Sequence, residues 1–175
     1  QGIPFKGRVL NSISAFWFNF TKEIIQNHFI TMDTKNYPSV MHEYCESLEG
    51  RSMLVRRGKI IPIECIVRGY VSGTGWNDYK NTGNISGIPI KAGLKESEKL
   101  DEPIFTPSTK AEIGEHDENI SFDDACMIAG GELMEEVREK AIAIYKKCSD
   151  YALSKGIIIA DTKMEFALDS SGKLM

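Results

Sequence analysis

An apolar run at residues 60–70, IIPIECIVRGY, has the length and residue types of a buried strand. A chain with such a strand must build a packed core around it. Alternate side chains of a strand share a face, so Glu64 and Arg68 lie on one side and Cys65 on the other. The charges on the first side have two interpretations. They form a salt bridge within the strand, or Arg68 is a fork that binds a carboxylate or phosphate.

A small-residue loop, SGTG, follows this strand. If Arg68 binds an anion, the backbone N–H of Gly73 and the hydroxyl of Thr74 can complete the same site. No Walker-type lysine follows the glycines, so the loop does not predict an ordinary nucleotide-binding loop. Within the strand itself, Pro62 indicates that one edge is unpaired at that point.

A second strand is predicted at residues 156–168, GIIIADTKMEFAL, and its apolar first half indicates that it enters the interior. Asp161, Lys163 and Glu165 alternate along it and therefore share one face. Two carboxylates with a lysine between them suit a magnesium–phosphate site, because Mg²⁺ prefers oxygen ligands and an ammonium neutralises phosphate charge. The alternative is an ordinary solvated strand face, and the spacing leaves both open.

The first part of the chain predicts a helix over residues 12–30, which Ser12 or Ser14 can cap. We assign its apolar side chains to the core rather than to a binding surface. Those at helical spacing are Ile13, Phe16, Trp17, Phe20 and Ile24.

The middle of the chain is less regular. Residues 31–50 predict an irregular connection, and residues 52–56 predict a strand that a turn at 57–59 joins to the apolar strand. Residues 72–121 are rich in Gly, Pro, Thr, Ser and charge, with one short helix at 76–80. A polar segment of this length is usually functional or disordered, and its varied composition favours an ordered ligand-binding loop.

A capping box at Ser121 and Asp124 starts a short helix, which Gly130–Gly131 interrupts. A longer helix is predicted at 132–155, and Gly156 is its natural stop. The side chains of its buried stripe are Leu133, Val137, Ala141, Ile144 and Cys148. With no internal repeat visible, the elements predict an α+β fold, a sheet with packing helices.

The composition argues against several classes of function. A chain of 175 residues with 26% charged residues and a net charge of −4 is long enough for one globular domain and has no basic footprint for nucleic acid. No apolar run is long enough to span a membrane, and no secretory signal opens the chain. The four cysteines form no close pair, which favours reduced thiols in a cytoplasmic protein over a zinc site.

Three long motifs carry a resemblance to a known family. PIECIVRGYVSGTGW, GLKESEKLDEPIFTPSTKAEIGEHDENIS and GIIIADTKMEF occur in the order found in phosphoribosylaminoimidazole-succinocarboxamide synthases, the SAICAR synthetases of purine biosynthesis. GIPFKGRVLNSISAFWF and NHFI also fit, so the resemblance covers nearly all of the chain. It implies a two-lobed ATP-binding α+β fold. It also implies a magnesium-requiring ligase that joins L-aspartate to 5-amino-1-(5-phosphoribosyl)imidazole-4-carboxylate through an acyl phosphate, giving SAICAR, ADP and phosphate.

The resemblance also implies roles for individual residues. Arg68 and Thr74, with Gly73, match the positions that hold the phosphoribosyl phosphate. Asp161 and Lys163 match polar residues around the reacting carboxylate and the nucleotide phosphates.

Further roles follow from the same motifs. Glu165 matches a magnesium-binding carboxylate, and Asp117 matches an active-site aspartate. Lys110 and Glu112 are expected at the substrate, while Ile60 and Ile61 are expected as the apolar floor under adenine. From the residues alone, His116 is either a general base or a plain hydrogen-bonding group. We expect Glu64 to orient Arg68.

The departures from the family pattern concern mainly the two ends. Ala167 stands where Gly is usual, and Ser72 where Thr or Ala is usual. The N-terminal β-lobe with its phosphate loop, and a C-terminal strand with a second magnesium aspartate, have no match. We therefore expect residues 1–56 to join an N-terminal lobe to the core and residues 57–175 to form one ATP- and substrate-binding unit.

Three functions are compatible with these observations. The first is the ligase, with ATP, L-aspartate and the imidazole carboxylate as small-molecule partners and an oligomeric state that the sequence does not fix. The second is an ATP-dependent kinase of related fold, against which the substrate-side motifs argue. The third is a catalytically incompetent fragment, which we expect if 175 residues are the entire polypeptide.

Overall fold

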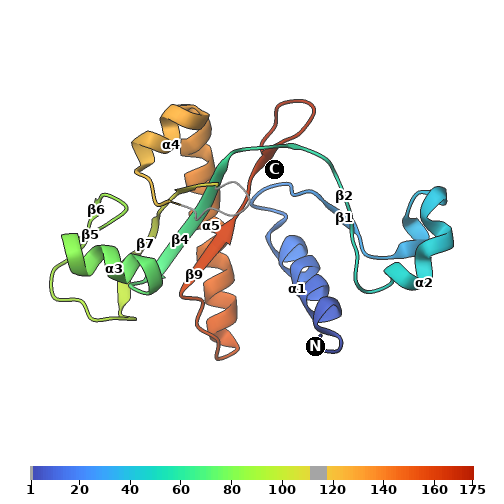
Figure 1. Ribbon diagram of the computed structural model, residues 1–175, viewed down its shortest axis with the longest axis horizontal. Helices are drawn as coiled ribbons and strands as arrows, with labels where there is room; N and C mark the ends of the chain where they lie inside the picture. Colours follow the sequence, from blue (N-terminus) through green and yellow to red (C-terminus); the bar gives the residue numbers. More distant parts are fainter. Residues whose placement is uncertain (1, 111–117) are drawn as a thin grey trace.

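A computed structural model describes residues 2–110 and 118–175, and it is an α+β arrangement, as predicted (Figure 1). The helices are α1 (Lys6–Thr21), α2 (Cys45–Leu48), α3 (Gly73–Thr82), α4 (Phe122–Ala129) and α5 (Gly131–Ser154), with 3₁₀ turns η1 (Thr34–Asn36) and η2 (Ser39–Tyr44). The strands are β1 (Phe29–Thr31), β2 (Leu54–Val55), β3 (Lys59–Ile60), β4 (Ile63–Tyr70), β5 (Asn84–Ile85), β6 (Ile88–Pro89), β7 (Lys99–Phe105), β8 (Ser108–Thr109), β9 (Asp161–Met164) and β10 (Ala167–Leu168).

The central sheet is built around β4, whose first seven residues are all buried. β9 pairs antiparallel with one edge of β4, with Arg68 opposite Asp161. β7 and then β8 pair antiparallel with β4, and β8 continues the register of β7. The prediction of a buried strand is confirmed, although it begins at Ile63, after a break at Pro62, and not at residue 60.

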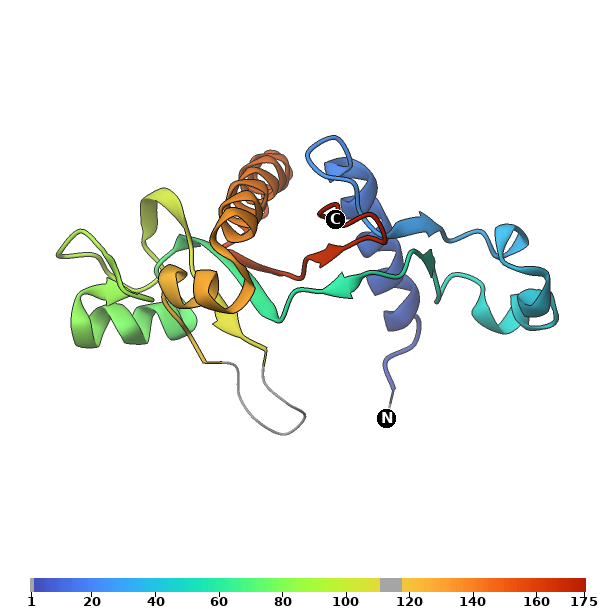
Figure 2. The same ribbon diagram turned by 90° about the horizontal axis from the view of Figure 1, so that it is seen from above.

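Helix α5 covers one face of this sheet (Figures 1 and 2). The alternate residues Ile63, Cys65 and Val67 point into the core against it, together with Phe105 of β7. The predicted helix at 132–155 is confirmed within one residue at each end, and Gly156 follows it in the left-handed region with φ 77°. The predicted capping box at the start of α4 is present as well.

The remaining elements extend to either side of the sheet. Figure 1 shows α3, β5 and β6 beyond one end of β4, and β1, β2 and α2 as an arm on the other side of α1. β1 pairs with β2, and β3 pairs with β10. The two strands predicted at 52–56 and 60–70 therefore do not pair with each other across the predicted turn at 57–59, and each pairs with strands distant in the sequence.

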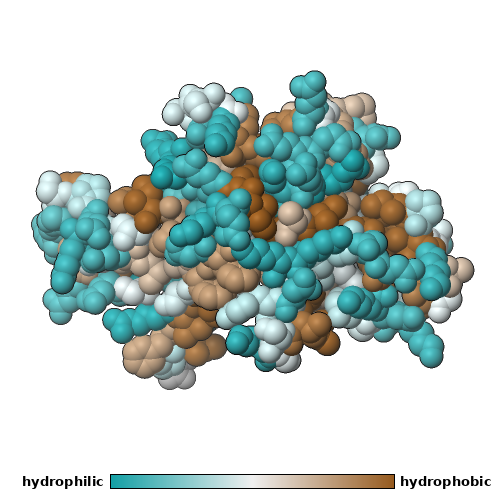
Figure 3. Space-filling model, turned by 180° about the vertical axis from the view of Figure 1, so that it is seen from behind, coloured by the Kyte–Doolittle hydropathy of each residue, from teal (hydrophilic) through white to brown (hydrophobic). Residues whose placement is uncertain are grey.

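Helix α1 differs from its prediction at both ends. It covers Lys6–Thr21 instead of 12–30, and no side chain caps its start at Phe5. Ile13 and Phe16 are exposed, so the assignment of this face to the core is wrong for them. Figure 3 shows apolar side chains gathered near the N-terminal end of this helix.

Two further predictions are corrected. Residues 72–121 are not a single loop, because they contain α3 and β7, and β7 pairs with β4. The strand predicted at 156–168 is shorter, since β9 begins only at Asp161, and Ile157 and Ile158 are exposed instead of interior.

Candidate active site

Arg68 lies at the centre of the sheet face that α5 does not cover, and only 4% of it is exposed. Within residues 2–110 and 118–175, its guanidinium contacts three polar side chains. Nε donates to Thr106 Oγ1 at 3.1 Å, and Nη2 donates to Thr74 Oγ1 at 2.9 Å. Nη1 lies 3.6 Å from Asp161 Oδ2 across the β4–β9 pair. The fold therefore brings three of the predicted site residues, Arg68, Thr74 and Asp161, into one cluster.

Arg68 stays positively charged although it is buried. Burial lowers the pKa of Arg68, and the nearby carboxylates of Asp161 and Asp78 oppose that shift. An arginine remains protonated under such conditions because its ordinary pKa lies far above neutral pH. The result is a fixed, oriented cation on the sheet face that bears Glu64, Arg68 and Asp161, which we call the polar face. Such a cation suits a phosphate or carboxylate ligand.

Thr74 reaches Arg68 because the SGTG segment is the start of a helix. Ser72 is the N-cap of α3, and residues 73–75 form its first turn. Gly73 has a positive φ of 55°, and a Cβ on Gly75 would come within 3.2 Å of Arg68 Cδ. The glycines therefore let the helix start lie directly against the guanidinium, where its backbone N–H groups add to an anion site.

Glu64 and Lys163 form a second pair on the same face. Lys163 Nζ lies 3.6 Å from Glu64 Oε2, and the carboxylate side chain is only 10% exposed. The expectation that Glu64 orients Arg68 is thus corrected: Lys163 is the ion-pair partner of Glu64, while Thr106, Thr74 and Asp161 surround the guanidinium. The predicted alternation is confirmed, because Asp161, Lys163 and Glu165 are exposed while Phe166 is buried.

Glu165 forms an ion pair with Lys110, and both are predicted site residues. A carboxylate oxygen is a ligand of the kind that Mg²⁺ prefers. Among residues 2–110 and 118–175 no group of three or more His, Cys, Asp or Glu side chains is placed to hold a metal. The predicted residues Glu112, His116 and Asp117 lie outside the described part of the chain.

A pocket of about 640 Å³ lies beside this polar face. Ile60, Lys163 and Glu165 line it, together with side chains of α1 such as Trp17. Its volume falls within the ordinary range for a small-molecule site. Ile60 is 53% exposed and reaches the pocket, whereas Ile61 is only 4% exposed and belongs to the core.

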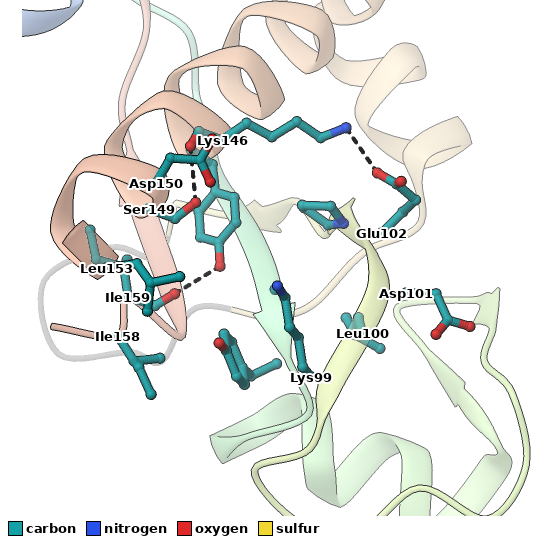
Figure 4. A pocket seen from close by; sticks show the side chains of 14 residues that line it. Lys99, Leu100, Asp101, Glu102, Lys146, Ser149, Asp150, Leu153, Ile158 and Ile159 are labelled. Carbon is teal, nitrogen blue, oxygen red and sulfur yellow. Dashed lines mark hydrogen bonds and ion pairs between the residues drawn. The ribbon is translucent and has the colours of Figure 1, made fainter. Parts of the chain in front are cut away.

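A second pocket, of about 290 Å³, lies between β7 and the end of α5 (Figure 4). Lys146 and Glu102 form an ion pair at 2.8 Å across it. Tyr145 closes its inner wall by donating from its hydroxyl to the Ile159 carbonyl at 2.7 Å. Among the described residues, none of those predicted for substrate, nucleotide or metal lines this pocket.

Sequence reasoning missed two groups at the polar face. Thr106 was seen only as part of a polar segment, and Asp78 only as part of a short helix. The signal that finds Thr106 is the register of β7, which places it on the same face as Arg68, and this register is not visible without the strand pairing.

Known proteins resemble this chain both in sequence and in fold. The family model of SAICAR synthetase matches residues 1–175. The phosphoribosylaminoimidazole-succinocarboxamide synthase of Geobacter sulfurreducens is 59% identical over 168 residues, which are 96% of this chain and 57% of that protein. The fold matches the SAICAR synthase of Saccharomyces cerevisiae complexed with SAICAR at a TM-score of 0.89 and 42% identity, covering all of this chain and 59% of the yeast protein.

A more distant structure shares the fold. A type-2 SAICAR synthetase in complex with ADP matches with a TM-score of 0.76 at 23% identity, over all of this chain and 64% of that one. The chain thus spans a little under three fifths of the length of the curated relatives it matches. In the described part of the chain, no helix is both long and apolar enough to cross a membrane.

Proposed function

The chain belongs to the SAICAR synthetase family, and we propose that the full-length protein is an ATP-dependent ligase of purine biosynthesis. It joins L-aspartate to 5-amino-1-(5-phosphoribosyl)imidazole-4-carboxylate and releases SAICAR, ADP and phosphate. The observation that carries the proposal is the match of the family over all 175 residues, with Arg68, Thr74 and Asp161 gathered on one polar face. We place the reaction in the cytoplasm and assign residues 57–175 to the ATP- and substrate-binding core, which residues 1–56 would join to an N-terminal lobe.

The phosphate of the imidazole ribonucleotide would bind at Arg68. The guanidinium has five N–H groups, and its three neighbours within residues 2–110 and 118–175 leave donors for a ligand. The Thr74 hydroxyl and the first turn of α3, which begins at Gly73, add donors on the same side. Such a site binds through charge-assisted hydrogen bonds and fixes the position of the sugar.

The nucleotide would lie in the larger pocket, with adenine against Ile60 and its phosphates toward Lys163. Lys163 would neutralise phosphate charge from its place beside Glu64. Ile61 would support Ile60 from the core and not touch adenine. The solved relative with bound ADP supports a nucleotide site in this fold.

Magnesium is implied by the family, and the donor set fits it. Glu165 would hold the ion, since Mg²⁺ is usually bound by one or two carboxylates together with substrate phosphates. When bound, the ion would neutralise phosphate charge during transfer. Lys110, which now pairs with Glu165, would then be released toward the substrate.

The chemistry follows as two steps. The imidazole carboxylate attacks the γ-phosphorus of ATP, ADP leaves, and an acyl phosphate forms. The amine of L-aspartate then attacks the acyl carbon, phosphate leaves with the bonding electron pair, and the nitrogen gives up one proton to solvent as the amide bond forms. Asp161 would orient groups at the reacting carboxylate, and Asp117 and Glu112 are proposed to assist there.

The test is an assay of ADP and product formation by the full-length protein, with each substrate omitted in turn. We expect SAICAR, identified by mass, only when ATP, L-aspartate and the imidazole carboxylate are all present. ADP formation without L-aspartate would favour a kinase. No turnover with a folded protein that still binds the imidazole carboxylate would favour a catalytically incompetent protein. Arg68→Lys is expected to raise the KM for the imidazole carboxylate strongly, with the KM for ATP unchanged.

A further inference from the structure

Thr106 lies at the junction between β7 and β8, and none of its surface is exposed. Its backbone N–H donates to the Ile66 carbonyl at 2.8 Å, which fixes the residue beside the middle of β4. Its side chain accepts a hydrogen bond from Arg68 Nε at 3.1 Å, and the hydroxyl lies 3.5 Å from the Ile66 carbonyl. A neutral hydroxyl is thus the buried partner of a buried cation.

The geometry of this contact decides which way the guanidinium faces. Nε is the atom nearest the strand, so a bond there fixes the rotation of the planar group. With Nε held in this way, Nη2 donates to Thr74 and Nη1 lies beside Asp161. Arg68 loses side-chain freedom in this arrangement before any ligand binds, which is the physical basis of preorganised binding.

We infer that Thr106 is a positioning residue of the proposed substrate site. Its hydroxyl holds Arg68 Nε so that the Nη edge, beside Thr74, is presented to the phosphate of the imidazole ribonucleotide. The inference rests on the proposed function. Thr106 does not touch the substrate in this arrangement, because it lies on the Nε side of the guanidinium and is fully buried.

A structural role alone would have a different signature. A threonine that only fills space would be replaced well by valine, which has nearly the same shape and no hydroxyl. A positioning hydroxyl would be replaced well by serine instead. The matched control is Thr162→Val on the neighbouring strand β9, because the Thr162 hydroxyl is enclosed and has no hydrogen-bond partner within the described residues.

The first experiment is steady-state kinetics of the full-length protein. Thr106→Val is expected to raise the KM for the imidazole ribonucleotide by about tenfold or more, the cost of a lost hydrogen bond to a charged group. The KM for ATP is expected to stay within about twofold, since Thr106 acts only on Arg68. Thr106→Ser and Thr162→Val are expected to retain the wild-type values. An equal loss in Thr106→Val and Thr162→Val, or none in Thr106→Val, overturns the inference.

A double-mutant cycle provides the second readout. Arg68→Lys has no Nε–H, so Thr106→Val should have no further effect on the KM for the imidazole ribonucleotide in that background. The same fold-change in both backgrounds would show that Thr106 acts through packing. If Thr106→Val does not fold, Thr106→Cys takes its place, because a thiol is a weak acceptor.

The two levels of the proposal fail in different ways. A folded wild-type protein that forms no product from the three substrates refutes the ligase and this inference with it. An active wild-type protein whose Thr106→Val variant is unchanged refutes the inference alone.

Discussion

At the scale of one residue, the burial of Arg68 is energetically costly. Removing a guanidinium from water costs several kcal/mol unless hydrogen bonds and an opposite charge replace the solvent. At Arg68 the two threonine hydroxyls and Asp161 provide that replacement. A site of this kind contributes little to stability, and binding of an anion is a physical reason to retain it.

Gly69, the next residue of β4, is required by the core on the opposite face. A Cβ there would lie 2.0 Å from the Tyr145 hydroxyl oxygen and 2.8 Å from Cζ. We predict that Gly69→Ala lowers the free energy of unfolding by about 2 kcal/mol, because the ring must shift in a packed core. The measurement is urea denaturation of the full-length protein.

Two comparisons test the cause of that loss. Gly69→Ala combined with Tyr145→Phe should be more stable than the sum of the single changes, since the clashing oxygen is absent. Gly131→Ala is the matched control, because a Cβ at this helix start meets nothing within 4 Å. Additive losses in the double variant would contradict the steric explanation.

His28 provides a pH-dependent prediction. Burial lowers the pKa of His28 from 6.5, so the unfolded state binds more protons than the folded state as the pH falls through that value. Stability from this histidine is therefore present above about pH 6.5 and is lost toward acid pH. The Tm of the wild-type protein should fall more between pH 7.5 and pH 5.5 than the Tm of His28→Gln. Parallel curves would contradict the prediction.

At the scale of elements, the capping box stabilises the start of helix α4. Ser121 Oγ accepts from the Asp124 backbone N–H at 3.1 Å, and Asp124 Oδ2 accepts from the Ser121 backbone N–H at 3.3 Å. We predict that Ser121→Ala lowers the free energy of unfolding by about 1 kcal/mol. Ser149→Ala is the control, because that hydroxyl only donates to the Lys146 carbonyl of its own helix. A thermal melt in which both variants behave alike would contradict the role of the cap.

The sequence predicted those elements that carry their own local signal. α5 has a long apolar stripe and a glycine stop, α4 has a capping box, and β4 has a continuous apolar run. β7 lacked such a signal because in KLDEPIF only Leu100 and Phe105 are buried and charged residues lie between them, so its pairing with β4 is needed to recognise it as a strand. For α1, exposed apolar side chains at helical spacing cannot be distinguished from a buried stripe by periodicity alone.

The candidate site, like the elements of the fold, was predicted only where the sequence carries a local signal. Alternation along two strands put Arg68, Asp161, Lys163 and Glu165 on polar faces, and the structure unites these faces into one. The partner of Glu64 was wrong because sequence spacing shows which side chains share a strand face but not which strand lies beside it. Ile60 and Ile61 were grouped as neighbours, although the break before β4 sends one to the pocket and the other to the core.

In the whole molecule the two proposed ligand sites differ in their surroundings: the face that bears Arg68 lies away from α5, whereas Ile144 and Cys148 of α5 line the larger pocket. The polar face presents Arg68 near the start of α3, while the larger pocket lies toward α1 and the β3–β10 pair. Lys163 belongs to both, since it pairs with Glu64 on the face and lines the pocket. In the proposed reaction, a phosphoryl group that passes from the pocket to a substrate on the polar face would therefore meet Lys163.

The larger pocket supports a prediction about nucleotide binding by the full-length protein. Ile60 is 53% exposed and lines this pocket, so an adenine ring that covers it would remove its apolar surface from water. Ile60→Asn should raise the Kd for ADP, measured by titration calorimetry, by about tenfold. Val55→Asn is the matched control, because Val55 is an exposed β-branched residue of the preceding strand that does not line the pocket. Equal affinity of Ile60→Asn and Val55→Asn would place the adenine elsewhere, whereas a selective loss in Ile60→Asn assigns the nucleotide to this pocket and leaves the polar face around Arg68 to the second substrate.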